Sequence, residues 1–219
     1  MKRLNHLQRL LLFLLLLGLC TPLLAPALLQ MQPRINRALG LRAAPKTFAE
    51  RLAYAAEDIV DPGIVYDPAY VQIGYPGGDV PPKRGVCADV VIRAYRKVGV
   101  DLQVLVHEDM KKHFAAYPKN WGLRRTDRNI DHRRVYNLAT YFKRHGATLP
   151  CTKNGDDYRP GDIVVWEVQH QGHIGIVSSL RNGANTRCLI VHNIGAGQVL
   201  QDMLFNYSII GHYRYAPKL

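Results

Sequence analysis

Residues 162–178, with the sequence DIVVWEVQHQGHIGIVS, decide the fold of this chain. Two runs of β-branched and aromatic residues flank the short polar segment 169–172, a pattern that is typical of a β-hairpin. Two more segments of strand composition follow at 188–193 and 209–215. The last third of the chain therefore predicts an antiparallel sheet.

Before these strands, the hydrophobic pattern has the period of a helix. Thr47 and Glu50 match a capping box, which predicts a helix over about 48–59. Three further helices are predicted where apolar residues recur at helical intervals, over about 87–98, 104–116 and 133–145. Helices that precede an antiparallel sheet predict an α+β fold. We expect the helix that begins at Cys87 to pack on the sheet, with two extra helices inserted before His173.

The first residues, 1–27, have the order of parts of a secretory signal peptide. A basic start precedes an apolar run over 10–17 and a small-residue pattern at 25–27. An uncleaved N-terminal anchor is the alternative, because 10–29 has about the length that spans a bilayer. Both alternatives predict that the rest of the chain is exported, to the periplasm or elsewhere in a bacterial envelope.

The exported part is predicted to be one domain after a short linker. We interpret 28–46, which lack a clear period, as the linker and 47–219 as a single domain. A chain of 219 residues with 47% hydrophobic and 21% charged residues is that of a folded protein, which excludes a disordered or collagen-like chain.

The charge is strongly positive and bears on the partner. The formal net charge is +12, and removal of 1–27, which hold three basic and no acidic residues, leaves +9. For an exported protein, this favours anionic cell wall, anionic lipid headgroups or acidic substrates over nucleic acid. The alternative is that the charge only keeps the protein soluble.

Cys87 is the candidate nucleophile. It stands where an extended segment rich in Tyr, Pro and Gly turns into a helix. Unpaired amides and the helix dipole at such a position stabilise a thiolate. The alternative is that Cys87 is a small buried hydrophobic residue.

Two histidines are candidates for the groups that assist a thiol. His173 opens the second predicted strand and can take the thiol proton and return it to a leaving group. His192 lies on the third strand and can orient His173 through a ring nitrogen. Taken singly, His173 is better explained as a polar residue at a strand end, and His192 is equally explained as a core histidine.

The ordered arrangement of these elements resembles the NlpC/P60 superfamily of papain-like cysteine amidases and peptidases. A Cys at a helix start, a Gly-Asp before one strand, a Gly-His-Ile-Gly opening the next and a His on the third carry this resemblance. It implies a papain-like core and a site of Cys87, His173 and His192. The segments 85–91, 131–134 and 192–197 are more narrowly similar to the bacterial domain-of-unknown-function family 1287, which implies the same fold and site but little about substrate.

The resemblance also implies that a tyrosine upstream of the nucleophile contributes to the oxyanion site. Tyr66, Tyr70 and Tyr75 compete for this role, and we take Tyr70 and Tyr75 as the candidates. The Cys87 amide is a second potential donor.

A dense charge cluster lies between the second and third predicted helices. Its candidate substrate-binding residues are Asp131, His132, Arg133 and Arg134. Guanidinium groups in this number can clamp a substrate carboxylate or phosphate. The alternatives are a solvated loop that pairs its own charges and, for Asp131, a helix cap.

The other two cysteines of the domain are assigned by counting. If Cys87 is free, Cys151 and Cys188 remain as a candidate disulfide between the loop before the first strand and the start of the third. We expect no metal and no cofactor, because the histidines lack a zinc-binding spacing and no cysteine pair lies close in sequence.

These features together predict an exported cysteine hydrolase that cleaves an amide or peptide bond. Peptidoglycan peptides are the expected substrate class, with no nucleic acid partner and membrane contact only through an uncleaved N-terminus. The alternatives are a non-catalytic wall-binding scaffold domain and a thiol-dependent acyltransferase.

Overall fold

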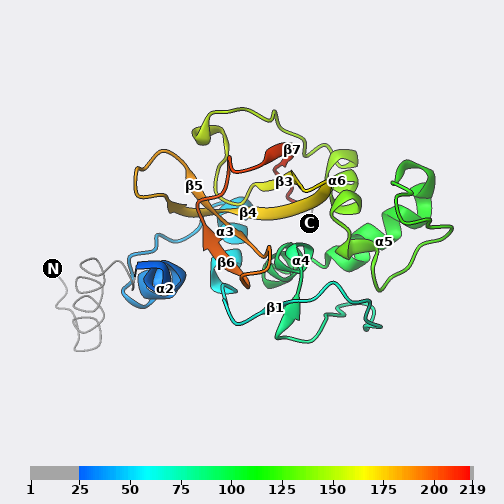
Figure 1. Ribbon diagram of the computed structural model, residues 1–219, viewed down its shortest axis with the longest axis horizontal. Coiled ribbons are helices and arrows are strands. Elements are labelled where there is room, and N and C mark those ends of the chain that lie inside the picture. Colours follow the sequence, from blue (N-terminus) through cyan, green and yellow to red (C-terminus); the bar gives the residue numbers. More distant parts are fainter. Residues whose placement is uncertain (1–24, 218–219) are drawn as a thin grey trace. The chain divides into compact units, whose positions relative to one another are not determined.

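The computed structural model of this chain describes residues 25–217 (Figure 1). Their contacts form two compact units, which end and begin at Pro45 and Lys46. Residues 1–24, the greater part of the predicted signal peptide, lie outside the described residues. No helix within 25–217 combines the length and the apolar character that a bilayer crossing needs.

The N-terminal unit contains the helix α2, Ala25–Ala38. The prediction of an irregular segment is therefore wrong for this part of 28–46. Pro33 lies inside the helix, where a proline normally interrupts the backbone hydrogen bonds, and it obscures the pattern in the sequence. The side chains of Gln32 and Asn36, one turn apart, share a hydrogen bond of 2.8 Å.

The second unit is built on a five-stranded antiparallel sheet with the order β6-β5-β4-β3-β7 (Figure 1). The strands are β3 Ile163–Val168, β4 Gln171–Arg181, β5 Cys188–His192, β6 Val199–Gln201 and β7 Ser208–Tyr213. The four predicted strands are confirmed. The last of them, β7, turns back to pair with β3, and the short β6 was not foreseen.

The hairpin between β3 and β4 is tighter than predicted. Gln169 and His170 form a two-residue connection, with φ of 48° and 62° respectively. Left-handed backbone at both positions matches the right-handed twist of the flanking strands. The strand β4 therefore begins at Gln171, two residues before His173.

Helices cover the sheet and hold the site. They are α3 Phe48–Asp58, α4 Cys87–Lys97, α5 Leu102–His113 and α6 Val135–Arg144, with short 3-10 helices at Phe114–Ala116, Asp131–Arg133 and Gly155–Asp157. The capping box of Thr47 and Glu50 is present. Both α3 and α4 pack against β4. Along the chain, α5 and α6 follow the Cys87 helix and precede the strands of the sheet. The predicted α+β class, with two inserted helices, is confirmed.

The start of α4 is fixed by a buried carboxylate. Asp89 accepts a hydrogen bond from the Val86 amide at 2.7 Å and thereby caps the helix. Arg133 binds the same carboxylate through two hydrogen bonds, of 2.8 and 3.0 Å. The first turn of α4 is thus tied to the 3-10 helix that precedes α6.

One side of the sheet is closed by an apolar cluster that includes Trp166 and Cys188. The Trp166 indole donates a hydrogen bond of 2.8 Å to the Leu204 carbonyl. All cysteines within 25–217 are free thiols, with Cys188 buried in this cluster and Cys151 exposed. The predicted Cys151–Cys188 disulfide is therefore absent, because the two side chains occupy different environments.

Candidate active site

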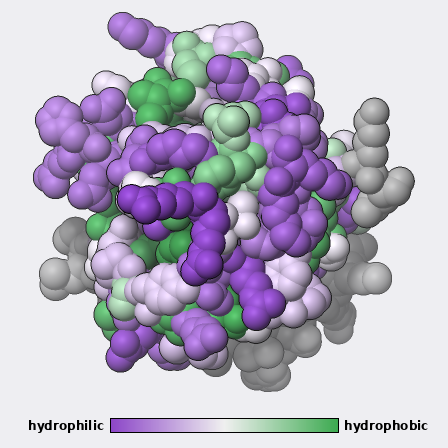
Figure 2. Space-filling model, turned by 90° about the vertical axis from the view of Figure 1, so that its right-hand side faces the viewer, coloured by the Kyte–Doolittle hydropathy of each residue, from purple (hydrophilic) through white to green (hydrophobic). Residues whose placement is uncertain are grey.

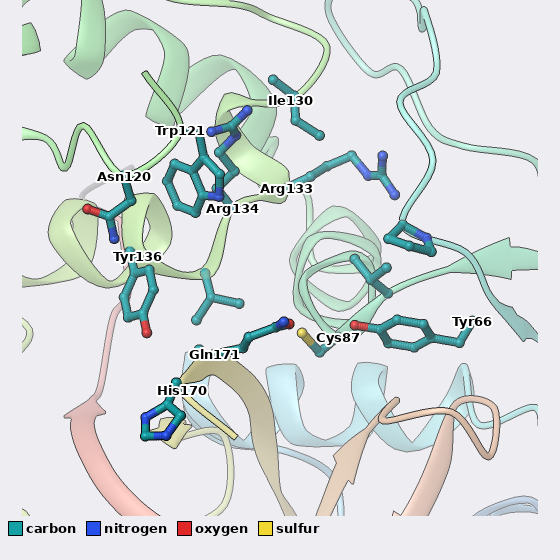
Figure 3. A pocket seen from close by; sticks show the side chains of 14 residues that line it. Tyr66, Cys87, Asn120, Trp121, Ile130, Arg133, Arg134, Tyr136, His170 and Gln171 are labelled. Atoms are coloured by element: carbon teal, nitrogen blue, oxygen red, sulfur yellow. The ribbon is translucent and has the colours of Figure 1, made fainter. Parts of the chain in front are cut away.

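The Cys87 side chain lies at the start of α4 and reaches a cavity. The residue is 4% exposed and lines a cavity of about 440 Å³ (Figure 3). Its neighbours along the chain form the short strand β2, Arg84–Gly85, which pairs in parallel with β1, Val65–Tyr66. The cysteine therefore begins a helix at the rim of a cavity, as the sequence predicts.

Burial sets the acidity of the Cys87 thiol. Desolvation raises its pKa to about 11, and the carboxylate of Asp89 acts in the same direction. Backbone hydrogen bonds, the largest from Ile174, oppose this shift. The thiol is therefore protonated at neutral pH and has to lose its proton to a base when it attacks. The Ile174 hydrogen bond also places the sulfur beside β4, next to His173 in the chain.

His173 and His192 form a buried pair. The His173 Nε2 lies 3.1 Å from the His192 Nδ1, and the two rings meet edge to face. Desolvation lowers the pKa of His173 to about 3 and that of His192 to about 4. Both imidazoles are therefore neutral at neutral pH. Through its Nε2, His173 thus contacts His192, and its Nδ1 is the ring nitrogen not used in this pair.

Gln201 extends this pair into a relay. Its Oε1 lies 3.0 Å from the His192 Nε2, because β6 pairs with β5 in a register that sets Gln201 diagonally across from His192. An amide oxygen only accepts hydrogen bonds, so the His192 Nε2 carries the proton and its Nδ1 accepts from the His173 Nε2. The one remaining lone pair, on the His173 Nδ1, is then available for a thiol proton.

Gly175 permits the close approach of the two histidine strands. A Cβ at this position would lie 2.8 Å from a methyl group of Ile190 and 3.1 Å from the His192 Cβ. Because 2.8 Å is shorter than real carbon contacts and 3.1 Å is tight, a side chain at Gly175 would force Ile190 to move and would press on His192. The Gly-His-Ile-Gly pattern thus has a steric reason.

The tyrosine beside the thiol is Tyr66. It lines the same cavity, and its hydroxyl points toward the Cys87 sulfur in Figure 3. Burial and then the neighbouring Cys87 raise the pKa of Tyr66. The choice of Tyr70 and Tyr75 is not supported, since neither lines the cavity and each donates a hydrogen bond to a carboxylate elsewhere, at 2.9 and 3.0 Å.

The predicted substrate-binding cluster separates into buried and cavity-lining members. Asp131 and His132 are buried and do not line the cavity. Desolvation lowers the pKa of His132 to about 4. Arg133 lines the cavity, but its charge is compensated by Asp89. These three residues therefore belong mainly to the framework of the cavity.

Arg134 differs from its neighbour. It lines the cavity with its guanidinium over the Trp121 ring, 4.2 Å from the ring centroid. Arg133 and Arg134 point in different directions in Figure 3. Of the four candidates, Arg134 is thus the one that keeps an uncompensated charge at the cavity.

Metal-ligating side chains do not gather at this site. Within 25–217, no three His, Cys, Asp or Glu side chains converge to hold an ion. The groups that can do chemistry here are a thiol, a neutral imidazole and hydrogen-bond donors. Such a set suits nucleophilic attack on a carbonyl carbon, assisted by a base.

Comparison with known proteins places the chain in a family. Residues 53–215, which include every residue of the relay, match the family described as Domain of unknown function (DUF1287). The chain belongs to this family. It is 50% identical over 204 residues to "Uncharacterized protein YijF" of Escherichia coli (strain K12), and the match covers 92% of each protein.

A solved structure is also similar to the chain. The structure of NlpC1 from Trichomonas vaginalis is 15% identical, with a TM-score of 0.43. The similarity covers 81% of this chain and 47% of that protein, so the chain spans about half its length.

In this DUF1287 domain, sequence reasoning named Tyr66 as a competitor but did not choose it, and it missed Gln201. The parallel pairing of Tyr66 with Gly85 brings Tyr66 close to Cys87. Strands of two residues are too short to give a recognisable pattern in the sequence. Gln201 lies on a strand of three residues, too short for a detectable alternation. The sequence after His192 therefore contains no local signal for Gln201.

Proposed function

We propose that this protein is a cysteine hydrolase that cleaves an amide bond of a peptide. The observation that carries the proposal is the relay of His173, His192 and Gln201, which begins on β4 one residue before Ile174, whose backbone hydrogen-bonds to the Cys87 thiol. A relay of this kind fixes one tautomer of the base, which a histidine with only a structural role does not need.

The first half of the reaction forms an acyl-enzyme. The Cys87 sulfur attacks the carbonyl carbon while its proton passes to the His173 Nδ1. The oxyanion that develops is stabilised by the Tyr66 hydroxyl and by the Cys87 amide. The carbon–nitrogen bond then breaks, and His173 returns the proton to the leaving amine, which gives a thioester and a neutral imidazole.

The second half regenerates the thiol. A water molecule gives a proton to the His173 Nδ1 and attacks the thioester carbonyl. The carbon–sulfur bond breaks, and the sulfur takes the proton back from His173 to release a carboxylic acid. Throughout, His192 accepts from His173 and stabilises its charged form, because the charge is shared along the relay to Gln201.

The proposed substrate is the peptide part of bacterial peptidoglycan. The signal-like N-terminus supports export to the envelope, and a net charge of +9 after its removal supports an anionic partner. The face around α5, seen in Figure 2, is mostly hydrophilic. The resemblance to cysteine amidases of the NlpC/P60 type supports the same substrate class.

Digestion of purified sacculi, followed by LC-MS of the released muropeptides, tests the proposal. The protein should release new muropeptides, Cys87→Ala should release none, and Cys151→Ala, which removes an exposed thiol, should act like the wild type. Intact sacculi that still bind both proteins would instead favour a scaffold. If the protein forms a thioester with a labelled acyl donor and passes the acyl group to an amine and not to water, an acyltransferase would be favoured.

A further inference from the structure

A cation at the cavity lacks an acceptor for its hydrogen bonds. Arg134 lies directly before α6, with its guanidinium over Trp121. Its Nη1 is enclosed by protein and has no hydrogen-bond partner within the described chain. An enclosed donor without a partner is unfavourable, and more so when it belongs to a charged group. A ligand in the cavity can supply the missing acceptor.

The two carboxylates that influence Arg134 electrostatically, those of Asp131 and Asp127, make their hydrogen bonds to other groups. Burial lowers the pKa of Arg134, and Asp131 and Asp127 only oppose this shift from a distance. Asp131 interacts with His107 at 3.1 Å and accepts from the Asp127 amide at 2.8 Å. The Asp127 side chain accepts from Tyr70 at 2.9 Å. The Asp131 Oδ1 is buried without a hydrogen-bond partner, and neither carboxylate forms an ion pair with Arg134 within the described chain.

The cavity as a whole favours an anion. Among residues 25–217, no Asp or Glu lines it, and the charge of Arg133 is compensated by Asp89. Arg134 therefore gives the cavity its net positive charge. Trp121 and Tyr136, with ring centroids 6.2 Å apart, form an aromatic wall next to this charge. The same cavity contains the Cys87 thiol.

We propose that Arg134 and Trp121 form a carboxylate-binding subsite, so that the peptide cleaved at Cys87 carries a free carboxylate near the scissile amide. This inference rests on the proposed function and defines its substrate class. A guanidinium binds a planar carboxylate through two parallel hydrogen bonds, and the indole beneath it keeps the guanidinium plane in place. The carboxylate belongs either to an acidic side chain or to the end of the peptide.

Thiol-reactive probes test the subsite without any hydrolysis. We would treat the protein with N-alkyl maleimides of increasing chain length that end in a carboxylate, and with the matching carboxamides. Peptide mapping by mass spectrometry gives the rate at each cysteine. The exposed Cys151 is an internal control, because it lies outside this cavity. The variants are Arg134→Gln, Arg134→Lys and, as a control on the same loop, Arg125→Gln, whose exposed side chain does not line the cavity.

The expected result is a preference for the carboxylate at Cys87 alone. At the best chain length, the carboxylate-to-carboxamide rate ratio should be about tenfold higher at Cys87 than at Cys151, as for a charge-assisted hydrogen bond. Arg134→Gln should remove this difference, Arg134→Lys should keep part of it, and Arg125→Gln should keep all of it.

Two results would overturn the subsite. In the first, the carboxylate-to-carboxamide rate ratio at Cys87 is unchanged in Arg134→Gln, or it falls as much in Arg125→Gln as in Arg134→Gln. The other is a phosphonate probe that reacts faster at Cys87 than the carboxylate does. Failure of the proposed function is seen separately, as intact sacculi, and does not alter these ratios. With cleaved peptides, amidation of either the terminal or the side-chain carboxylate shows which one depends on Arg134.

Discussion

Replacement of Gln201 by glutamate should lower the reactivity of the Cys87 thiol at mildly acidic pH. The Gln201 Oε1 lies 3.0 Å from the His192 Nε2, so a carboxylate there would face the same proton. At about 4 Å, a charge pair gains ~1 kcal/mol in bulk water and ~4 kcal/mol near a protein surface. At 1.36 kcal/mol for each pKa unit, this amounts to a rise of roughly 1–3 units.

The pKa of His192 would therefore rise from about 4 to roughly 5–7 in Gln201→Glu. Once protonated, His192 donates from its Nδ1 to the His173 Nε2. The single proton of neutral His173 must then sit on Nδ1, which can no longer accept the thiol proton. The variant should lose reactivity as the pH falls through the new pKa, whereas the wild type should stay constant down to about pH 5.

Two measurements follow this change directly. Long-range ¹H–¹⁵N correlation spectra of histidine-labelled protein report the tautomer and pKa of each imidazole. The rate of Cys87 alkylation by iodoacetamide, between pH 4 and 8, reports proton transfer from the thiol. Gln201→Met, which lacks an acceptor and a charge, should lower the rate by about 2- to 10-fold at every pH. A wild-type His173 with its proton on Nδ1, or an unchanged His192 pKa in Gln201→Glu, would refute the relay.

Three other predictions concern the same site. Tyr66→Phe should lower kcat for the release of muropeptides by roughly 10- to 100-fold without a matching change in KM, and Tyr70→Phe should leave kcat unchanged. Equal losses of kcat in the two variants would contradict the assignment of Tyr66 to the oxyanion site. Gly175→Ala should reduce the urea-measured free energy of unfolding by about 1–3 kcal/mol, because its Cβ would clash with Ile190 and press on His192; an unchanged midpoint would exclude the clash. His173 and His192 have lowered pKa values, so the unfolded chain binds their protons first as the pH falls below about 6.5. Stability should therefore fall from pH 7 to 5, by about 1–2 kcal/mol for each histidine. Urea unfolding at the two pH values measures this loss, and His192→Gln should reduce it.

Elements with a long or repeated pattern were predictable from the sequence. The Cys87 helix and the strand of His173 both have such patterns, and the thiol and the two imidazoles were therefore placed on the right elements. Helix α2 was missed because Pro33 argues against a helix on local grounds.

The groups that complete the site depend on contacts between distant segments. Tyr66 reaches Cys87 through a parallel bridge of two residues, and Gln201 reaches His192 diagonally across two strands. The preference for Tyr70 and Tyr75 over Tyr66 is therefore not supported, since spacing along the sequence cannot choose among the three tyrosines. The separation of Arg133 from Arg134 likewise required the position of Asp89, which is distant in sequence.

The shared carboxylate of Asp89 has a consequence for how this domain can change in evolution. Asp89 caps the helix that begins at Cys87 and binds Arg133, whose neighbour Arg134 lines the cavity. The segment between α4 and α6 is thus not an independent module that can be exchanged for another to obtain a new specificity. If this segment is replaced by that of a relative, the new segment has to contain a residue that pairs with Asp89, as Arg133 does here. Variation in what the domain recognises is therefore expected around Arg134, while Asp89 and Arg133 are inherited together.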